Sequence, residues 1–117
     1  MTTYEMSQED REVQERTRRF VDEELIPLEV ETELADGKLS EDVREKHHRI
    51  AMDLGLWAMN MPRELGGGGF PMFRQVLVSE HIGRATNGLG RCIHTPPAWA
   101  SEVVTKEQLE RWIVPTI

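Results

Sequence analysis

The sequence has a single cysteine, few aromatic residues and fewer basic than acidic side chains. Cys92 has no partner for a disulfide within the chain, and no apolar run at the N-terminus has the pattern of a secretion signal or a membrane span. The formal charge of −7 opposes binding to nucleic acids and to anionic membranes. These features predict a cytoplasmic protein with neither nucleic acid nor membrane as partner.

Strand patterns are missing as well, because apolar and polar residues do not alternate over any extended stretch. Helical periodicity is present instead. Ser7 can cap a first helix over residues 8 to about 35, and Pro27 should kink it because proline lacks an amide hydrogen. Ser40 can cap a second helix, which we expect to end at Gly55.

A third helix is predicted from Pro71 to about residue 85, and we expect it to be the central and most buried one. After irregular structure around Pro96 and Pro97, a short helix at residues 98–103 and a last helix complete the chain. Thr105 and Gln108 can form the capping box of that last helix. The prediction is one all-α domain over residues 1–117, a small array of about four to six helices.

Four consecutive glycines, Gly66–Gly69, separate the second and third expected helices. A P-loop requires Lys-Ser or Lys-Thr after its last glycine, and a dinucleotide loop follows a strand. Phe70 and Pro71 follow here, so neither phosphate-binding motif is present. The glycines are interpreted as a tight turn that uses backbone angles open only to glycine. Binding of an anion at the start of the next helix remains the alternative.

Several segments, in chain order, resemble the N-terminal domain of the acyl-CoA dehydrogenase family. The family's Pro-x-x-x-Gly-Gly-x-Gly turn is matched by PRELGGGG, and its preceding Leu-Gly-Leu segment by MDLGLWAMNMP. The helix after the turn is similar to VLVSEHIGR, and the Thr-x-x-Gln…Tyr-Leu-Pro close of the domain to TKEQLERWIVPTI. The family's first helix, with its proline, resembles SQEDREVQERTRRFVDEELIP. The resemblance covers nearly the whole chain.

The resemblance implies a flavoenzyme of fatty acid metabolism, an oxidoreductase in which FAD accepts a hydride from the β-carbon of an acyl-CoA after a glutamate removes the α-proton. Acyl-CoA oxidases and related flavin monooxygenases share this domain. In the family a β-domain holds the FAD and a C-terminal helical bundle carries the glutamate, so the resemblance puts no catalytic and no cofactor-binding residue in this chain. It implies the remaining domains or a partner subunit as partners, and a homo-oligomer.

The segment that follows the central helix lines the inner end of the acyl cavity in the family. The resemblance therefore assigns substrate binding to Leu89, Arg91, Cys92 and Thr95. A cation beside the acyl group would recognise a polar or carboxylated substrate, which singles out Arg91. The alternative is that Arg91 is an ordinary solvent-facing arginine. This chain departs from the family's smooth helix by the glycines around Leu89 and the two prolines that follow, which changes the pocket's shape.

For the other residues that could carry chemistry, the sequence favours structural roles. No histidine and carboxylate accompany Cys92, which is expected to be a small buried hydrophobe. The histidines lack ligand spacing, so no metal site is predicted. Glu80 is expected to pair with Arg84 one turn away. The three tryptophans are interpreted as core anchors rather than a stacking site; they are Trp57, Trp99 and Trp112.

Two functional classes follow from these observations. The first is the N-terminal domain of an acyl-CoA dehydrogenase-like flavoenzyme, inactive alone and contributing part of the acyl-binding wall. The second is a stand-alone helical interaction or subunit module without catalysis. In either class the chain has more large apolar residues than a small helical array can bury, and we expect an exposed apolar patch centred on residues 57–73.

Overall fold

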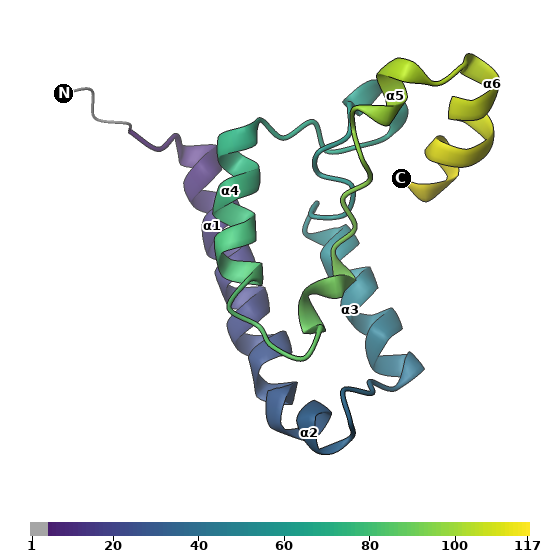
Figure 1. Ribbon diagram of the computed structural model, residues 1–117. Coiled ribbons are helices and arrows are strands. Elements are labelled where there is room, and N and C mark those ends of the chain that lie inside the picture. The colour runs from purple at the N-terminus through teal and green to yellow at the C-terminus, as the bar shows by residue number, and fades with distance from the viewer. Residues whose placement is uncertain (1–4) are drawn as a thin grey trace.

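The computed structural model describes residues 5–117, in which all regular structure is helical. Helix α1 (Gln8–Phe20) continues through a π-helical turn (Val21–Leu25) and a 3-10 turn (Ile26–Leu28) into α2 (Glu29–Leu34). The change of winding surrounds Pro27, whose missing amide hydrogen interrupts the regular hydrogen-bond ladder. This change of winding confirms the expected kink, and the chain stays helical from α1 through to α2 (Figure 1).

Helix α4 (Met72–Ile82) lies beside α1 (Figure 1). Between the two helices, Arg74 Nε donates to Asp10 Oδ1 at 2.8 Å, and Arg74 Nη1 lies 3.1 Å from Glu9 Oε1. Ser7 Oγ accepts from the Asp10 amide at 3.1 Å, so the predicted N-cap is confirmed. The Asp10 carboxylate in turn binds Arg74, which ties the first turn of α1 to α4.

Helix α4 is less buried than expected for a central helix. Met72 and Val76 are 71% and 46% exposed, because α4 packs against α1 on one side and leaves its other face open. The pairing expected between Glu80 and Arg84 is also wrong. Arg84 Nη1 reaches across to Asp22 Oδ1 at 2.8 Å, which joins α4 to the π-helical turn.

Helix α3 (Glu41–Asp53) begins after Ser40, whose Oγ accepts from the Val43 amide as predicted. In Figure 1 it stands apart from the pair formed by α1 and α4, with the chain after α4 passing between them. The main apolar cluster joins α1, its π-helical extension, α4, the connector after α3 and the 3-10 turn η4 (Leu89–Cys92). Its buried members are Val13, Phe20, Val21, Leu25, Leu56, Met59, Val78 and Leu89.

The glycine run forms a tight turn, as predicted. Gly66 and Gly69 have φ angles of 99° and 62°, in the left-handed region that favours glycine. Gly67 packs so closely on the connector that a Cβ there would lie 2.3 Å from the Met61 carbonyl oxygen. All four glycine amides donate to backbone carbonyls of residues 58–63. They are therefore not available to cradle a phosphate.

The C-terminal part forms an arm that projects from the other helices (Figure 1). It contains α5 (Ala100–Val103), α6 (Lys106–Gln108), a π-helical turn (Leu109–Ile113) and a 3-10 turn (Val114–Thr116). The capping box of Thr105 and Gln108 is present, as predicted. Two predicted core anchors on this arm are wrong, since Trp99 and Trp112 are 68% and 59% exposed.

The connector between α3 and α4 is more buried than expected. Met59 and Met61 are buried, because the glycine turn folds back on them through backbone hydrogen bonds. The exposed apolar patch predicted for residues 57–73 is therefore wrong over most of that connector. At the end of that range Met72 and Phe73 are exposed as predicted. The other large exposed apolar side chains of the described residues lie on α2, α3, α4 and the C-terminal arm: Val30, Leu34, Met52, Val76, Trp99, Val103 and Trp112.

Candidate functional site

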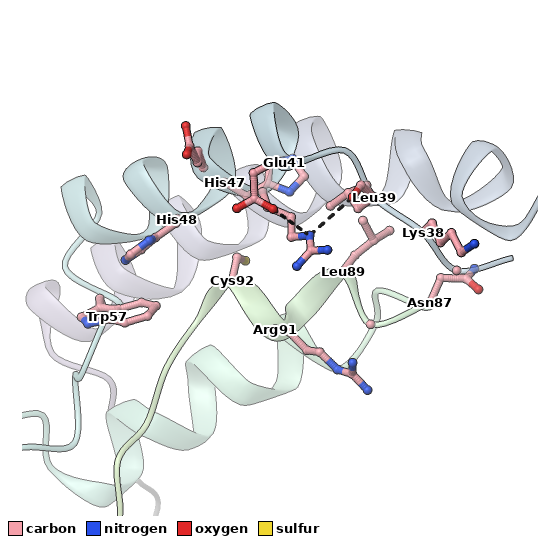
Figure 2. Close-up of a pocket in the computed structure, with 14 residues that line it drawn as sticks. Lys38, Leu39, Glu41, His47, His48, Trp57, Asn87, Leu89, Arg91 and Cys92 are labelled. Atoms are coloured by element: carbon pink, nitrogen blue, oxygen red, sulfur yellow. Dashed lines mark hydrogen bonds and ion pairs between the residues drawn. The ribbon is translucent and has the colours of Figure 1, made fainter. Parts of the chain in front are cut away.

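A cavity of about 430 Å³ lies between α3 and the segment of residues 87–92. Figure 2 shows Trp57 and His48 at one end of it and Lys38 and Asn87 at the other. Its fourteen lining residues come from the loop before α3, from α3 itself, from the connector, from the loop before η4 and from η4: Gly37, Lys38, Leu39, Glu41, Arg44, Glu45, His47, His48, Trp57, Asn87, Gly88, Leu89, Arg91 and Cys92.

The η4 wall of the cavity is held at its N-terminal end. Before it, the Thr86 amide donates to Glu29 Oε2 at 3.1 Å, and Asn87 Nδ2 donates to the Glu29 carbonyl oxygen at 3.3 Å. Gly88, with φ of 71°, then turns the chain into η4. Leu89 is buried in the main apolar cluster. These contacts fix the wall relative to α1 and α2.

Three of the four residues assigned to the substrate by resemblance line this cavity: Leu89, Arg91 and Cys92. Thr95 does not line it; this residue is exposed and lies beyond the end of η4. The guanidinium of Arg91 lies against Gly88, since a Cβ at Gly88 would be 3.4 Å from Arg91 Nε. Figure 2 shows that it points away from α3, so its charge lies at the rim.

The cavity wall carries more positive than negative charge, although the chain as a whole is acidic. Three basic residues (Lys38, Arg44, Arg91) and two acidic ones (Glu41, Glu45) line it. Arg44 Nε lies 3.9 Å from Glu41 Oε2 and 3.4 Å from the Leu39 carbonyl oxygen, as the dashed lines in Figure 2 mark. Within residues 5–117, Lys38 and Arg91 form no ion pair, and both are exposed to solvent.

Two titratable side chains of the cavity wall, His47 and Cys92, are uncharged at neutral pH. His47 is 2% exposed, its Nδ1 has no hydrogen-bond partner, and burial lowers the pKa of the imidazole below its ordinary value of 6.5. The nearby Glu24 carboxylate and carbonyl oppose that shift without reversing it. Burial also raises the pKa of the Cys92 thiol to about 11. His47 is therefore neutral and Cys92 protonated at neutral pH, which makes Cys92 a poor nucleophile.

An aromatic stack closes one end of the cavity. The rings of His48 and Trp57 have centroids 4.0 Å apart, and those of Trp57 and His94 are 5.0 Å apart. Trp57 Nε1 donates to the Thr116 carbonyl oxygen at 3.3 Å. Trp57 is thus half-buried between α3 and the C-terminal arm rather than a core anchor. Because His94 and Thr116 are far from Trp57 in the sequence, no local pattern predicts these contacts.

The described residues offer little to a metal ion or a flavin. No group of three or more histidine, cysteine or acidic side chains gathers anywhere in residues 5–117. The only glycine-rich turn there has its amides engaged in backbone hydrogen bonds, so it does not fit a flavin pyrophosphate. No helix within the described range is long and apolar enough to cross a membrane.

The chain is similar to the proteins of one known family. The sequence model of the family described as "Acyl-CoA dehydrogenase, N-terminal domain" matches residues 7–117. Among curated proteins, the (R)-benzylsuccinyl-CoA dehydrogenase of Thauera aromatica is 30% identical over an alignment of 113 residues. The match covers 90% of this chain and 28% of that protein. No solved structure matches the chain significantly.

Proposed function

Because the chain belongs to the acyl-CoA dehydrogenase family through its N-terminal domain, we propose that it forms one wall of the acyl pocket in an acyl-CoA dehydrogenase. The observation that carries this proposal is the cavity lined by Leu89, Arg91 and Cys92, three of the residues that the resemblance assigns to the substrate. The chain spans about 28% of the curated relative, so the whole enzyme's activity is part of the proposal.

In this proposal the chain binds and encloses the acyl group, and the oxidation occurs on residues outside it. FAD, held elsewhere, supplies the acceptor for the hydride that leaves the β-carbon. The neutral His47, the protonated Cys92 and the apolar Leu89 offer an acyl chain contacts on the cavity wall that need no counter-charge. The glycine turn has no free amides, which favours a flavin site outside this chain.

The substrate we propose carries a carboxylate besides the thioester. The relative's name includes a succinyl thioester, and such a thioester keeps one free carboxylate. Arg91 lines the cavity and has no acidic partner in the part of the chain that the structure describes. A guanidinium without a partner at the rim can form a charge-assisted hydrogen bond with that carboxylate.

The substrate proposal is tested in the longer protein that joins this chain to the remaining domains. Arg91→Leu should lower kcat/KM for succinyl-CoA relative to butyryl-CoA by about tenfold, the effect of losing one charge-assisted contact. Arg49→Leu is the matched control, because Arg49 is an exposed arginine on α3 that does not line the cavity. Equal changes for both substrates would refute a role for Arg91 in recognition.

The enzyme proposal itself is tested with the isolated chain and the longer protein side by side. The longer protein should be yellow and oxidise acyl-CoA with an artificial electron acceptor, whereas the purified 117-residue chain should be colourless and inactive. Stoichiometric flavin retained by the chain through gel filtration would contradict this division of roles. A colourless, inactive longer protein would favour the stand-alone helical module.

A further inference from the structure

We propose that Gly90 sets the width of the cavity and thereby limits how bulky an acyl group the cavity admits. Gly90 lies on η4 but does not line the cavity. Its missing Cβ lets η4 lie close against α4, away from α3, so Gly90 acts as a positioning residue for the wall. The inference deepens the proposed function and rests on it, because it names the residue that controls the substrate class of that same pocket.

The back of η4 is in contact with the last residue of α4. A Cβ at Gly90 would lie 2.8 Å from Ile82 Cγ2, closer than real side-chain atoms approach, and 3.4 Å from the Ile82 carbonyl oxygen. The Ile82 side chain does not turn away easily, because a β-branched residue is stiff at χ1 and this one packs against the main apolar cluster. Any residue larger than glycine at position 90 therefore requires η4 to move off α4.

The segment that contains η4 is tied down on both sides. Before η4, the Thr86 amide donates to Glu29 Oε2 at 3.1 Å. After η4, the Ala58 amide donates to the His94 carbonyl oxygen at 2.7 Å, which fixes the chain to the connector. Between these ties η4 keeps its own backbone hydrogen bonds. A push from α4 against the middle of η4 therefore moves it toward α3 and narrows the cavity.

The cavity has little room to absorb such a movement. Leu89, Arg91 and Cys92 line it from η4, and Figure 2 shows Cys92 pointing toward α3. The facing wall is held as well, because His47 is buried and its ring lies edge-on to Phe20, with centroids 6.2 Å apart. One extra methylene group in an apolar pocket changes kcat/KM by about 10–200-fold. A narrower cavity should therefore exclude a branched acyl group before a linear one.

The first test uses the single cysteine of the 117-residue chain as a reporter of the cavity's width. Two neutral thiol reagents of different bulk are compared, iodoacetamide and N-phenylmaleimide. Because both attack the same Cys92 thiolate, the ratio of their rates reports access to the cavity rather than ionisation of the thiol. We expect Gly90→Ala to slow N-phenylmaleimide about fivefold more than iodoacetamide.

A second substitution and a control separate movement of the wall from loss of stability. Ile82→Ala, added to Gly90→Ala, should restore the rate ratio, because it removes the Cγ2 atom that the new methyl group meets. Gly55→Ala is the control. Its φ of 74° makes alanine strained, but the new Cβ would meet only Arg16 Nη2 at 3.8 Å, and Gly55 lies outside the cavity. The rate ratio of this control should stay at that of the unaltered chain.

An unchanged rate ratio in the folded Gly90→Ala chain, or no recovery in the double variant, would overturn the inference. Circular dichroism establishes whether each variant is folded. If Gly90→Ala does not fold, Ile82→Ala alone decides, since it opens space behind Gly90 and lets η4 relax toward α4. N-phenylmaleimide should then react faster relative to iodoacetamide, and an unchanged ratio would overturn the inference.

The second test uses the longer protein and two acyl thioesters, isovaleryl-CoA, which is branched, and butyryl-CoA, which is linear. Gly90→Ala should lower kcat/KM for isovaleryl-CoA relative to butyryl-CoA by about tenfold, mainly through KM, and Ile82→Ala should reverse the change. A changed thiol ratio with an unchanged preference between the thioesters would refute control of the acyl group by Gly90.

Failure of this inference is distinguishable from failure of the proposed function. If the thiol ratio falls in Gly90→Ala and the longer protein oxidises no acyl-CoA, the role of Gly90 in the cavity's width stands and the enzyme proposal is wrong. If the longer protein oxidises both thioesters with the same preference in either form, and the thiol ratio does not change, the enzyme proposal stands and the role of Gly90 is wrong.

Discussion

The imidazole of His48 stacks on the indole of Trp57, with ring centroids 4.0 Å apart and planes inclined by 33°. The contact joins α3 to the connector that follows it. The same indole also contacts the imidazole of His94, which lies in the segment that leads to the C-terminal arm. One side chain thus links three segments of the chain. This arrangement gives Trp57 a structural role as well as its place at the end of the cavity.

Replacing Trp57 should loosen these links. Trp57→Ala should lower the free energy of unfolding by about 2 kcal/mol, less than the about 3–5 kcal/mol typical of a fully buried aromatic residue, because Trp57 is half-buried. Urea unfolding followed by circular dichroism measures the change. Trp112→Ala is the matched control, since Trp112 is 59% exposed and should change stability by less than about 0.5 kcal/mol. Equal losses in both variants would contradict the linking role.

The glycine turn should tolerate substitution unequally. In Gly67→Ala the new methyl group would lie 2.3 Å from the Met61 carbonyl oxygen, so the turn must move off the connector. We expect a loss of about 3 kcal/mol or more in the free energy of unfolding. Gly37→Ala, which has φ of 74° but no atom within 4 Å, should cost only the left-handed strain of about 1–2 kcal/mol. Thermal or urea unfolding of both variants measures the two losses. A larger loss in Gly37→Ala than in Gly67→Ala would show that the turn is loosely packed.

Local rules explain the parts of the fold that could be predicted. Ser7, Ser40 and Thr105 each cap a helix because capping depends on residues one turn away, and Pro27 disturbs the first helix for an equally local reason. The glycine turn was predicted as a turn, although the close approach of Gly67 to the connector was not. These features need no knowledge of distant neighbours.

Contacts between distant residues could not be predicted in this way. Asp10 binds Arg74 on another helix, and no local pattern in the sequence indicates that contact. The resemblance assigns substrate binding to the segment after the central helix, and Leu89, Arg91 and Cys92 of that segment line the cavity. The facing wall, with Lys38 and His47, depends on where α3 packs, and the sequence carries no local signal for that.

Stability should fall on mild acidification because of His47. Burial lowers the pKa of its imidazole in the folded protein below the ordinary value of 6.5, so the unfolded chain binds more protons at acidic pH. The stability due to neutral His47 is complete above about pH 6.5 and is lost as the pH falls through the folded pKa. His47→Leu should flatten this part of the curve, measured by urea unfolding between about pH 7 and pH 5. His81→Gln is the control, and an unchanged slope in His47→Leu would contradict the assignment.

The isolated chain should self-associate through the C-terminal arm. Trp99, Val103 and Trp112 are 68%, 72% and 59% exposed there, on a segment that projects from the other helices (Figure 1). Large exposed apolar patches drive association, and the arm offers aromatic side chains that are favoured at such contacts. Sedimentation equilibrium over a range of concentrations should give an average mass above the 13.5 kDa of the monomer. The double variant Trp99→Ser, Trp112→Ser should return the mass to that of the monomer, whereas Met72→Ser on the exposed face of α4 should not. A monomer mass for the unaltered chain at every concentration, with one cooperative thermal transition, would show that these residues do not associate.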